Sequence, residues 1–268
     1  DHSFTMAREL KRSIDLKVII TAKSYTPEIS GFCEKLDAVF FKRGRFINPL
    51  SFLNEINLMR FIRRQKADLV WFNNFSIYQS LLAKLFIKKL ILNTHDVELH
   101  PDESDFHGII AQKIALKLYR KRIAVMSNTQ QKIFEEKYSR TPWLLSLPVI
   151  DYYEACSESK TGNSKDSAEI TKVKFFFFGS VLAYKGIERL LEAADILEKK
   201  GCKFEVNIFG RIRYNNDEII RRIKSNKNIR LKDEFIDYRE IYNVYSENDM
   251  LIIPYIHVSQ CGPMLIGY

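Results

Sequence analysis

Short, wholly apolar segments alternate along the chain with segments of helical periodicity. The clearest pair lies between Lys174 and Leu197, where Phe175–Phe178 form an unbroken apolar run and apolar side chains then recur every three or four positions. Such a run is typical of a strand buried on both faces, and the spacing after it predicts an amphipathic helix. Strands that alternate with helices favour an α/β fold with parallel sheets.

The same two patterns predict strands and helices in both halves of the chain. The predicted strands are Lys17–Ala22, Ala38–Phe41, Asp68–Phe72, Lys89–Thr94, Ile123–Ser127, Val173–Gly179, Phe204–Phe209, Ile229–Leu231 and Met250–Ile253. The predicted helices are Phe4–Ser13, Phe52–Lys66, Ile77–Ile87, Ile109–Arg122, Gln130–Lys137, Ile187–Lys200, Asp217–Lys224 and Arg239–Ser246. The polar, serine-rich stretch 156–171 has neither pattern and predicts a linker. We therefore expect two α/β domains, 1–155 and 172–268.

Composition describes a globular chain large enough for two domains. Its 268 residues are 46% hydrophobic and 13% aromatic. No apolar run approaches the roughly 20 residues that span a bilayer, and the first residues lack the apolar core of a secretory signal, so we expect a cytoplasmic protein. The four cysteines, Cys33, Cys156, Cys202 and Cys261, lack metal-ligand spacing, which favours isolated thiols over a zinc site or a disulfide framework.

The net charge of +9 is concentrated in the first half. Residues 1–165 contain 26 Lys and Arg against 18 Asp and Glu, whereas residues 166–268 contain 16 against 15. Such a basic surface attracts anionic lipid headgroups, a phosphate-bearing acceptor or nucleic acid, unless it serves only to keep the protein soluble. No nucleic-acid-binding motif accompanies the basic clusters, so we expect no nucleic-acid partner.

The loops after the strands of the second half carry the candidate binding residues. After the first of these strands come Gly179, Ser180, Lys185 and Gly186, and a glycine loop with a lysine before a helix suits a phosphate or diphosphate. An ordinary turn with an exposed lysine is the alternative. The other strand ends carry Gly210, Arg211, Phe235, Ile236, Ser259, Gln260, Cys261 and Gly262. Ligands of open parallel sheets bind beyond the carboxyl ends of the strands, so we expect one rim of loops. The fingerprints of a standard dinucleotide-binding Rossmann unit and of a P-loop are absent.

Four motifs in succession resemble one family. The series FFFFGS…KGIERLLEAADIL, VNIFG, IRLKDEFIDYREIYNVYSENDMLIIPY and SQCG is similar to the C-terminal domain of the group 1 (family 4) glycosyltransferases. Less closely, LILNTHDVELHP and IAVMSNTQQKIFEEKY resemble segments of that family's N-terminal domain. The resemblance implies the GT-B fold, in which two Rossmann-like domains face each other across a cleft. It also implies an incomplete second domain in a chain truncated at both ends.

The resemblance implies transfer of a sugar from a UDP- or GDP-sugar to the hydroxyl of a saccharide or lipid-linked acceptor. In that family the transfer usually retains the anomeric configuration and usually needs no metal, and we expect no cofactor. The loop of Gly179, Lys185 and Gly186 matches the part that holds the donor diphosphate. By position, Gly210 and Arg211 match the next strand end, and Phe235 and Ile236 match the turn beside the nucleobase. His95 matches a histidine directed toward the donor sugar, and we expect His95 and the adjacent Asp96 to be the catalytic residues.

The chain departs from the family pattern at several positions. Ser180 stands where many members have an arginine, a cation that Arg211 could replace. The paired glutamates of the family fall at Ser259 and Gly267, although SQCG resembles a variant of polysaccharide-type members. We therefore expect an enzyme of cell-surface polysaccharide or glycolipid synthesis, held at the inner face of an anionic membrane by its basic domain. A catalytically silent partner subunit is the alternative, and a nucleic-acid-binding protein is less favoured.

Overall fold

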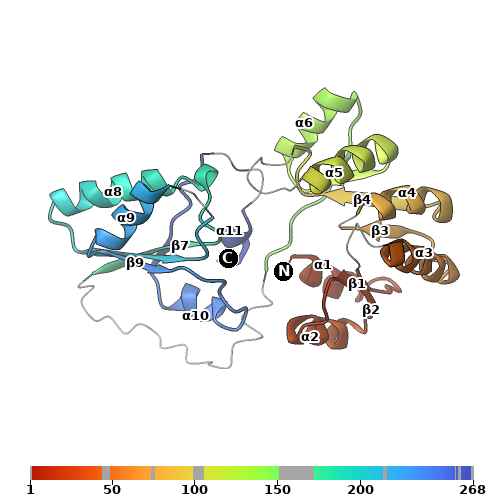
Figure 1. Ribbon diagram of the computed structural model, residues 1–268, viewed down its shortest axis with the longest axis horizontal. Helices are drawn as coiled ribbons and strands as arrows, with labels where there is room; N and C mark the ends of the chain where they lie inside the picture. The colour runs from red at the N-terminus through yellow and green to blue at the C-terminus, as the bar shows by residue number, and fades with distance from the viewer. Residues whose placement is uncertain are drawn as a thin grey trace. The chain divides into compact units, whose positions relative to one another are not determined.

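The computed structural model describes residues 2–43, 49–73, 76–98, 106–150, 172–213, 216–256, 258 and 261–266. The chain divides into two compact units, Asp1–Pro148 (unit 1) and Val149–Tyr268 (unit 2), which are described separately (Figure 1). The predicted linker, 156–171, lies outside the described residues. No described helix in either unit is both long and apolar enough to cross a membrane.

Unit 1 is built on parallel strands. A two-stranded sheet pairs β1 with β2, and a four-stranded sheet has the order β3-β4-β5-β6. The strands are β1 (Ile19–Ala22), β2 (Val39–Lys42), β3 (Val70–Phe72), β4 (Leu90–Thr94), β5 (Ile123–Val125) and β6 (Trp143–Leu144). The helices are α1 (His2–Leu10), α2 (Pro27–Leu36), α3 (Pro49–Arg64), α4 (Ile77–Phe86), α5 (Phe106–Tyr119) and α6 (Asn128–Tyr138). One hydrophobic core joins α3, α4, α5 and α6 to β4 and β5.

Unit 2 has a four-stranded parallel sheet with helices on both faces. Its strand order is β10-β7-β8-β9, and β7 and β8 pair over their whole length. Its strands are β7 (Val173–Phe178), β8 (Phe204–Phe209), β9 (Ile229–Lys232) and β10 (Met250–Leu251). Its helices are α8 (Ile187–Lys199), α9 (Asp217–Ser225), α10 (Ile241–Ser246) and α11 (Gly262–Ile266). Figure 1 shows α8 and α9 on one face of the sheet and α10 on the other.

The four phenylalanines of β7 contact two different hydrophobic clusters. Phe175 and Phe177 pack with α8 and α9, whereas Phe176 and Phe178 pack with α10. The prediction of a strand buried on both faces is therefore confirmed, and so is the α/β class.

The structure also has elements that the hydrophobic pattern did not predict, namely α2, β6 and α11. Helix α10 begins at Ile241, two residues later than predicted. The Arg239 N–H donates to the Asp237 carboxylate at 2.9 Å, and the Glu240 N–H donates to the Asp237 carbonyl at 2.9 Å. These bonds form a turn, which delays the start of the helix.

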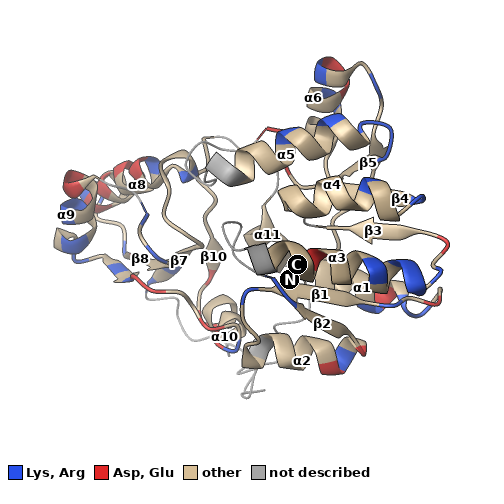
Figure 2. Ribbon diagram, turned by 45° about the vertical axis from the view of Figure 1, so that its right-hand side comes forward, with Lys and Arg blue, Asp and Glu red and all other residues tan. Residues whose placement is uncertain are grey.

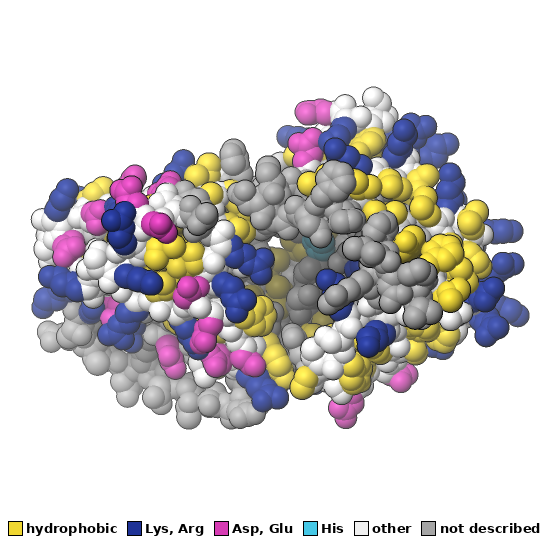
Figure 3. All heavy atoms as spheres, in the orientation of Figure 1, with side chains coloured by type: hydrophobic (Ala, Val, Ile, Leu, Met, Phe, Trp, Pro, Cys, Tyr) yellow, Lys and Arg dark blue, Asp and Glu magenta, His cyan; other side chains and the backbone are white. Residues whose placement is uncertain are grey.

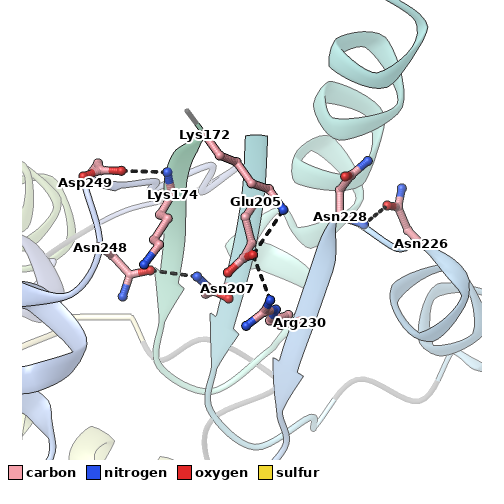
Figure 4. Close-up of polar contacts among 9 residues, drawn as sticks. All are labelled: Lys172, Lys174, Glu205, Asn207, Asn226, Asn228, Arg230, Asn248 and Asp249. Carbon is pink, nitrogen blue, oxygen red and sulfur yellow. Dashed lines mark hydrogen bonds and ion pairs between the residues drawn. The ribbon is translucent and has the colours of Figure 1, made fainter. Parts of the chain in front are cut away.

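A buried carboxylate lies on the α10 face of the unit 2 sheet. The Oε2 atom of Glu205, on β8, is 3.2 Å from Lys172 Nζ and 3.2 Å from Arg230 Nη2 (Figure 4). Burial raises the pKa of Glu205, but hydrogen bonds from Lys172 and Asn207 and the charge of Arg230 outweigh it, so that the net shift is downward. Beside it, Asn207 donates to Asn248 at 2.8 Å.

Because the pKa of Glu205 is lowered in the folded state, ionisation of this group stabilises the fold above its unfolded pKa. That contribution is lost as the pH falls through the folded value. We expect Glu205→Gln to lower the free energy of unfolding by about 1–2 kcal/mol at neutral pH and by much less near about pH 3. Urea unfolding at both pH values measures this, with the exposed Glu198→Gln as control. An equal loss at both pH values would contradict the ion-pair account.

Candidate functional site

The strand order of unit 2 reverses between β7 and β10. From β7 the chain adds β8 and then β9 on one side, and it then crosses to place β10 on the other side of β7. In open parallel sheets the crevice at such a reversal, outside the carboxyl ends of the strands, is where ligands bind. The loops that follow β7 and β10 therefore form the part of unit 2 to search for a site.

The loops after β7 and β8 run side by side beyond the sheet. The Gly179 N–H donates to the Phe209 carbonyl at 2.9 Å, and the Val181 N–H donates to the Arg211 carbonyl at 3.0 Å. Gly210 has φ 140°, and a Cβ atom there would lie 2.2 Å from the Gly179 carbonyl oxygen. Such contact leaves room only for glycine at this position. Arg211 is exposed beside the loop that contains Ser180.

Lys185 lies among aromatic rings at the end of the β7 loop. It closes a short 3₁₀ helix, Ala183–Lys185. Its Nζ atom is 5.6 Å from the ring centroid of Tyr255 and 5.8 Å from that of Tyr184. It is also 3.4 Å from the position of a Cβ atom built on Gly179. Cation–π contacts of this kind hold the ammonium group beside the glycine loop.

Gly186 brings the β7 loop against the loop after β10. It has φ 69°, and a Cβ atom there would lie 2.1 Å from the Pro254 carbonyl oxygen. The Ile256 N–H donates to the Tyr184 carbonyl at 2.8 Å, which joins the same two loops a second time. The sequence patterns gave no role to Tyr184 or Tyr255, although Tyr184 precedes Lys185 and Tyr255 lies in the loop that follows β10.

The residues of the SQCG motif are partly described. Ser259 and Gln260 lie outside the described residues, whereas Cys261 is half-buried and Gly262 begins α11. Burial raises the pKa of the Cys261 thiol, opposed by the Met264 backbone and by the charge of Lys185. The charge of Lys185 therefore acts on the Cys261 thiol, so the segment between β10 and α11 lies near Lys185. The described thiols, those of Cys33, Cys202 and Cys261, are free.

The turn after β9 carries the two residues predicted beside a nucleobase. Phe235 is 80% exposed, whereas Ile236 is 5% exposed and packs with Phe176, Ile241 and Val244. The turn is tied to the β8 loop by the Ile212 N–H, which donates to the Asp233 carboxylate at 2.7 Å. Within this pair, only the Phe235 ring is exposed for stacking.

His95 and Asp96 lie in unit 1, at the carboxyl end of β4. The Asp96 carbonyl accepts hydrogen bonds from the Thr94 hydroxyl, at 2.8 Å, and from the Gln112 amide. Gln130 donates to the Asp96 carboxylate at 3.5 Å and accepts from the Val97 N–H at 2.6 Å. Both glutamines are buried, so α5 and α6 fix the backbone of Asp96 and Val97, directly after His95.

Among the described residues, no group of three or more His, Cys, Asp or Glu side chains could hold a metal ion. Lys185, Arg211 and Arg213 are described cations in the loops after β7 and β8, and such cations suit an anionic ligand. With the glycine loop, they form an edge suited to phosphate groups.

No family model and no curated protein matches the chain. Solved structures do match it. A glycosyltransferase from Rickettsia africae is 18% identical, with a TM-score of 0.61 over 95% of this chain and 69% of that one. The HepE protein of Anabaena, solved with UDP, is 12% identical, with a TM-score of 0.65 over 98% and 72% of the two chains. A UDP-GlcNAc 2-epimerase from Neisseria meningitidis, bound to UDP-GlcNAc, is 12% identical, with a TM-score of 0.54 over 93% and 72%.

The chain has the GT-B fold. The strand order in unit 2 is that of the first four strands of a Rossmann domain, 3-2-1-4, and unit 1 contributes a second parallel α/β arrangement. Because this GT-B fold is shared by transferases and by an epimerase, the reaction has to be argued from the residues at the strand ends.

Proposed function

We propose that this GT-B protein is a glycosyltransferase that binds a nucleotide-sugar donor at the carboxyl edge of unit 2. The observation that carries the proposal is the position of Lys185, which contacts the rings of Tyr184 and Tyr255 and lies beside Gly179 where the strand order reverses. The Anabaena HepE protein, which has this fold, was solved with UDP, with UDP-glucose, and with UDP and glucose. A UDP- or GDP-sugar is the donor class that we propose.

Each residue of the edge has a role in this proposal. The glycine loop lets the donor diphosphate approach the backbone, and Lys185 stabilises the charge that develops on the departing nucleoside diphosphate. Arg211, on the neighbouring loop, supplies a second cation. Phe235 offers an exposed ring to the nucleobase.

The remaining parts of the proposal concern the acceptor and the chemistry. In this proposal His95 contacts the donor sugar, and Asp96 fixes the backbone next to it. Residues 259–262 contact the phosphate groups of the donor. The transfer retains the anomeric configuration and serves cell-surface polysaccharide or glycolipid synthesis, at the inner face of the membrane. The acceptor is a saccharide or a lipid-linked saccharide. A catalytically silent partner subunit is the second candidate, favoured by the non-acidic residues Ser259 and Gly267.

Calorimetric titration of the chain with UDP and GDP tests the donor site. We expect one of the two nucleotides to bind and to raise the free energy of unfolding by about 2.7 kcal/mol at a hundredfold excess over its Kd. Adenosine diphosphate is the control for a site that accepts any diphosphate. Equal binding of all three nucleotides would reduce the site to a general anion site, and no binding would remove the proposed donor function.

A further inference from the structure

Helices α3, α4 and α5 of unit 1 expose positive charge without exposed negative charge. Their Lys and Arg side chains are all exposed: Arg60, Arg63, Arg64, Lys84, Lys113 and Lys117. The one carboxylate of the three helices, Glu55, is 5% exposed. Within the described part of the chain, none of these six cations forms an ion pair with a carboxylate. In Figure 2, α4 and α5 accordingly carry blue segments and no red.

Two leucines of α4 point away from the core of unit 1. Leu81 is 47% exposed and Leu85 is 78% exposed, and their i, i+4 spacing places them on one side of the helix. The opposite side of α4 contributes Leu82 and Ala83 to the core. A surface helix ordinarily turns polar side chains outward, and outward leucines mark an interaction site.

The amino ends of the neighbouring strands continue this surface. The Val70 N–H donates to the Lys89 carbonyl at 3.0 Å, so that Leu69, itself 51% exposed, lies beside the loop that follows α4. The Arg122 side chain donates to the Lys88 carbonyl, which joins the loop after α5 to the loop after α4. The exposed cations of this edge are Lys66, Lys88, Lys89, Arg120, Lys121 and Arg122, and Asp68 is the one carboxylate in the same loops.

A hollow suited to an anionic headgroup lies at the same edge. It has a volume of about 500 Å³ and is lined by Arg120, Lys121, Glu135, Ser139, Arg140 and Thr141. Three cations and two hydroxyl groups surround it, against one carboxylate. Figure 3 shows dark-blue side chains along the right-hand border of unit 1, beside a yellow hydrophobic area.

We propose that this surface, formed by α3–α5 and the loops at the amino ends of β3–β5, is the docking face of the protein for an anionic lipid bilayer. The cations bind lipid headgroups, and Leu69, Leu81 and Leu85 enter the boundary between headgroups and acyl chains. Nucleic acid would pair with the cations but would gain nothing from exposed leucines. The proposed function includes contact with a membrane, and this inference, which rests on it, specifies the surface of unit 1 that makes the contact.

Vesicle flotation tests the docking face without any nucleotide-sugar, so that a negative result leaves the donor site untouched. We compare vesicles of phosphatidylcholine alone with vesicles containing roughly one third phosphatidylglycerol. We expect at least about tenfold tighter binding to the anionic vesicles, lost at high salt. Equal or absent binding to the two kinds of vesicle would overturn the proposal.

Paired variants separate lipid insertion from simple charge attraction. We expect Leu81→Ser with Leu85→Ser to weaken vesicle binding about tenfold or more, whereas Ile196→Ser, at an exposed position of α8 in unit 2, leaves it unchanged. A Trp probe, Leu85→Trp, should shift its emission to shorter wavelength on anionic vesicles. Full vesicle binding by the serine double variant, or competition by an oligonucleotide at equal charge, would overturn the proposal in favour of a general polyanion surface.

Discussion

Replacing Lys185 with alanine is expected to lower donor turnover about 100- to 1,000-fold, and it is the largest effect that we predict for a single side chain. The ammonium group lies beside Gly179 and next to two tyrosine rings, at the edge where the strand order reverses. In the proposed function, the Lys185 ammonium group is the cation that balances the negative charge of the leaving nucleoside diphosphate.

The control for this substitution is Lys199→Ala, which removes an exposed lysine from the end of α8 in the same unit. We expect the control to bind UDP or GDP like the unmodified chain in calorimetry, and the Lys185 variant to bind many times more weakly. Thermal unfolding of both variants checks that they are folded. Unchanged nucleotide affinity in the Lys185→Ala protein would contradict the assignment of this lysine.

Gly186→Ala is expected to destabilise unit 2 by about 3 kcal/mol, against about 1 kcal/mol for Gly201→Ala. The two glycines have the same φ, 69°, so that the backbone strain of an alanine is equal at both. They differ in their surroundings, because a Cβ atom at 186 would overlap the Pro254 carbonyl oxygen at 2.1 Å, whereas nothing lies within 4 Å at 201. The difference in destabilisation between the two variants therefore measures the contact between the loops that follow β7 and β10.

Urea unfolding of the two glycine variants gives this difference directly. Because Gly186 joins the loops that surround Lys185, we also expect its variant to bind nucleotide less tightly, while Gly201→Ala binds normally. Equal destabilisation by the two substitutions would mean that the loops after β7 and β10 do not touch as described, and the proposed site would lose its geometry.

Much of the fold could be predicted from hydrophobic periodicity. The buried strand β8 has the predicted bounds, and α8 differs from its prediction by one residue, because each has an uninterrupted apolar pattern. Helix α2 was missed because Gly31 interrupts its short apolar pattern, although Thr26 caps it and Pro27 opens it. Strand β6 was missed because two exposed residues carry no pattern.

The candidate site was predictable only as a set of loop positions. The strand ends could be found in sequence, since each follows an apolar run. The approach of Tyr255 to Lys185 could not be, because it depends on β10 lying beside β7 across some 70 residues of intervening chain. Nor could the sequence separate Phe235 from Ile236, of which one is exposed and the other belongs to the core.

In the proposed function, the chain transfers a sugar from a nucleotide-sugar to an acceptor. The most direct measurement is the fate of the sugar when the chain is incubated with UDP- and GDP-sugars and with p-nitrophenyl glycosides or polyprenyl-linked saccharides. We expect release of nucleoside diphosphate together with an equal amount of glycosylated acceptor, both abolished by Lys185→Ala. Recovery of the sugar still attached to its nucleotide, whether unchanged or epimerised, would contradict it.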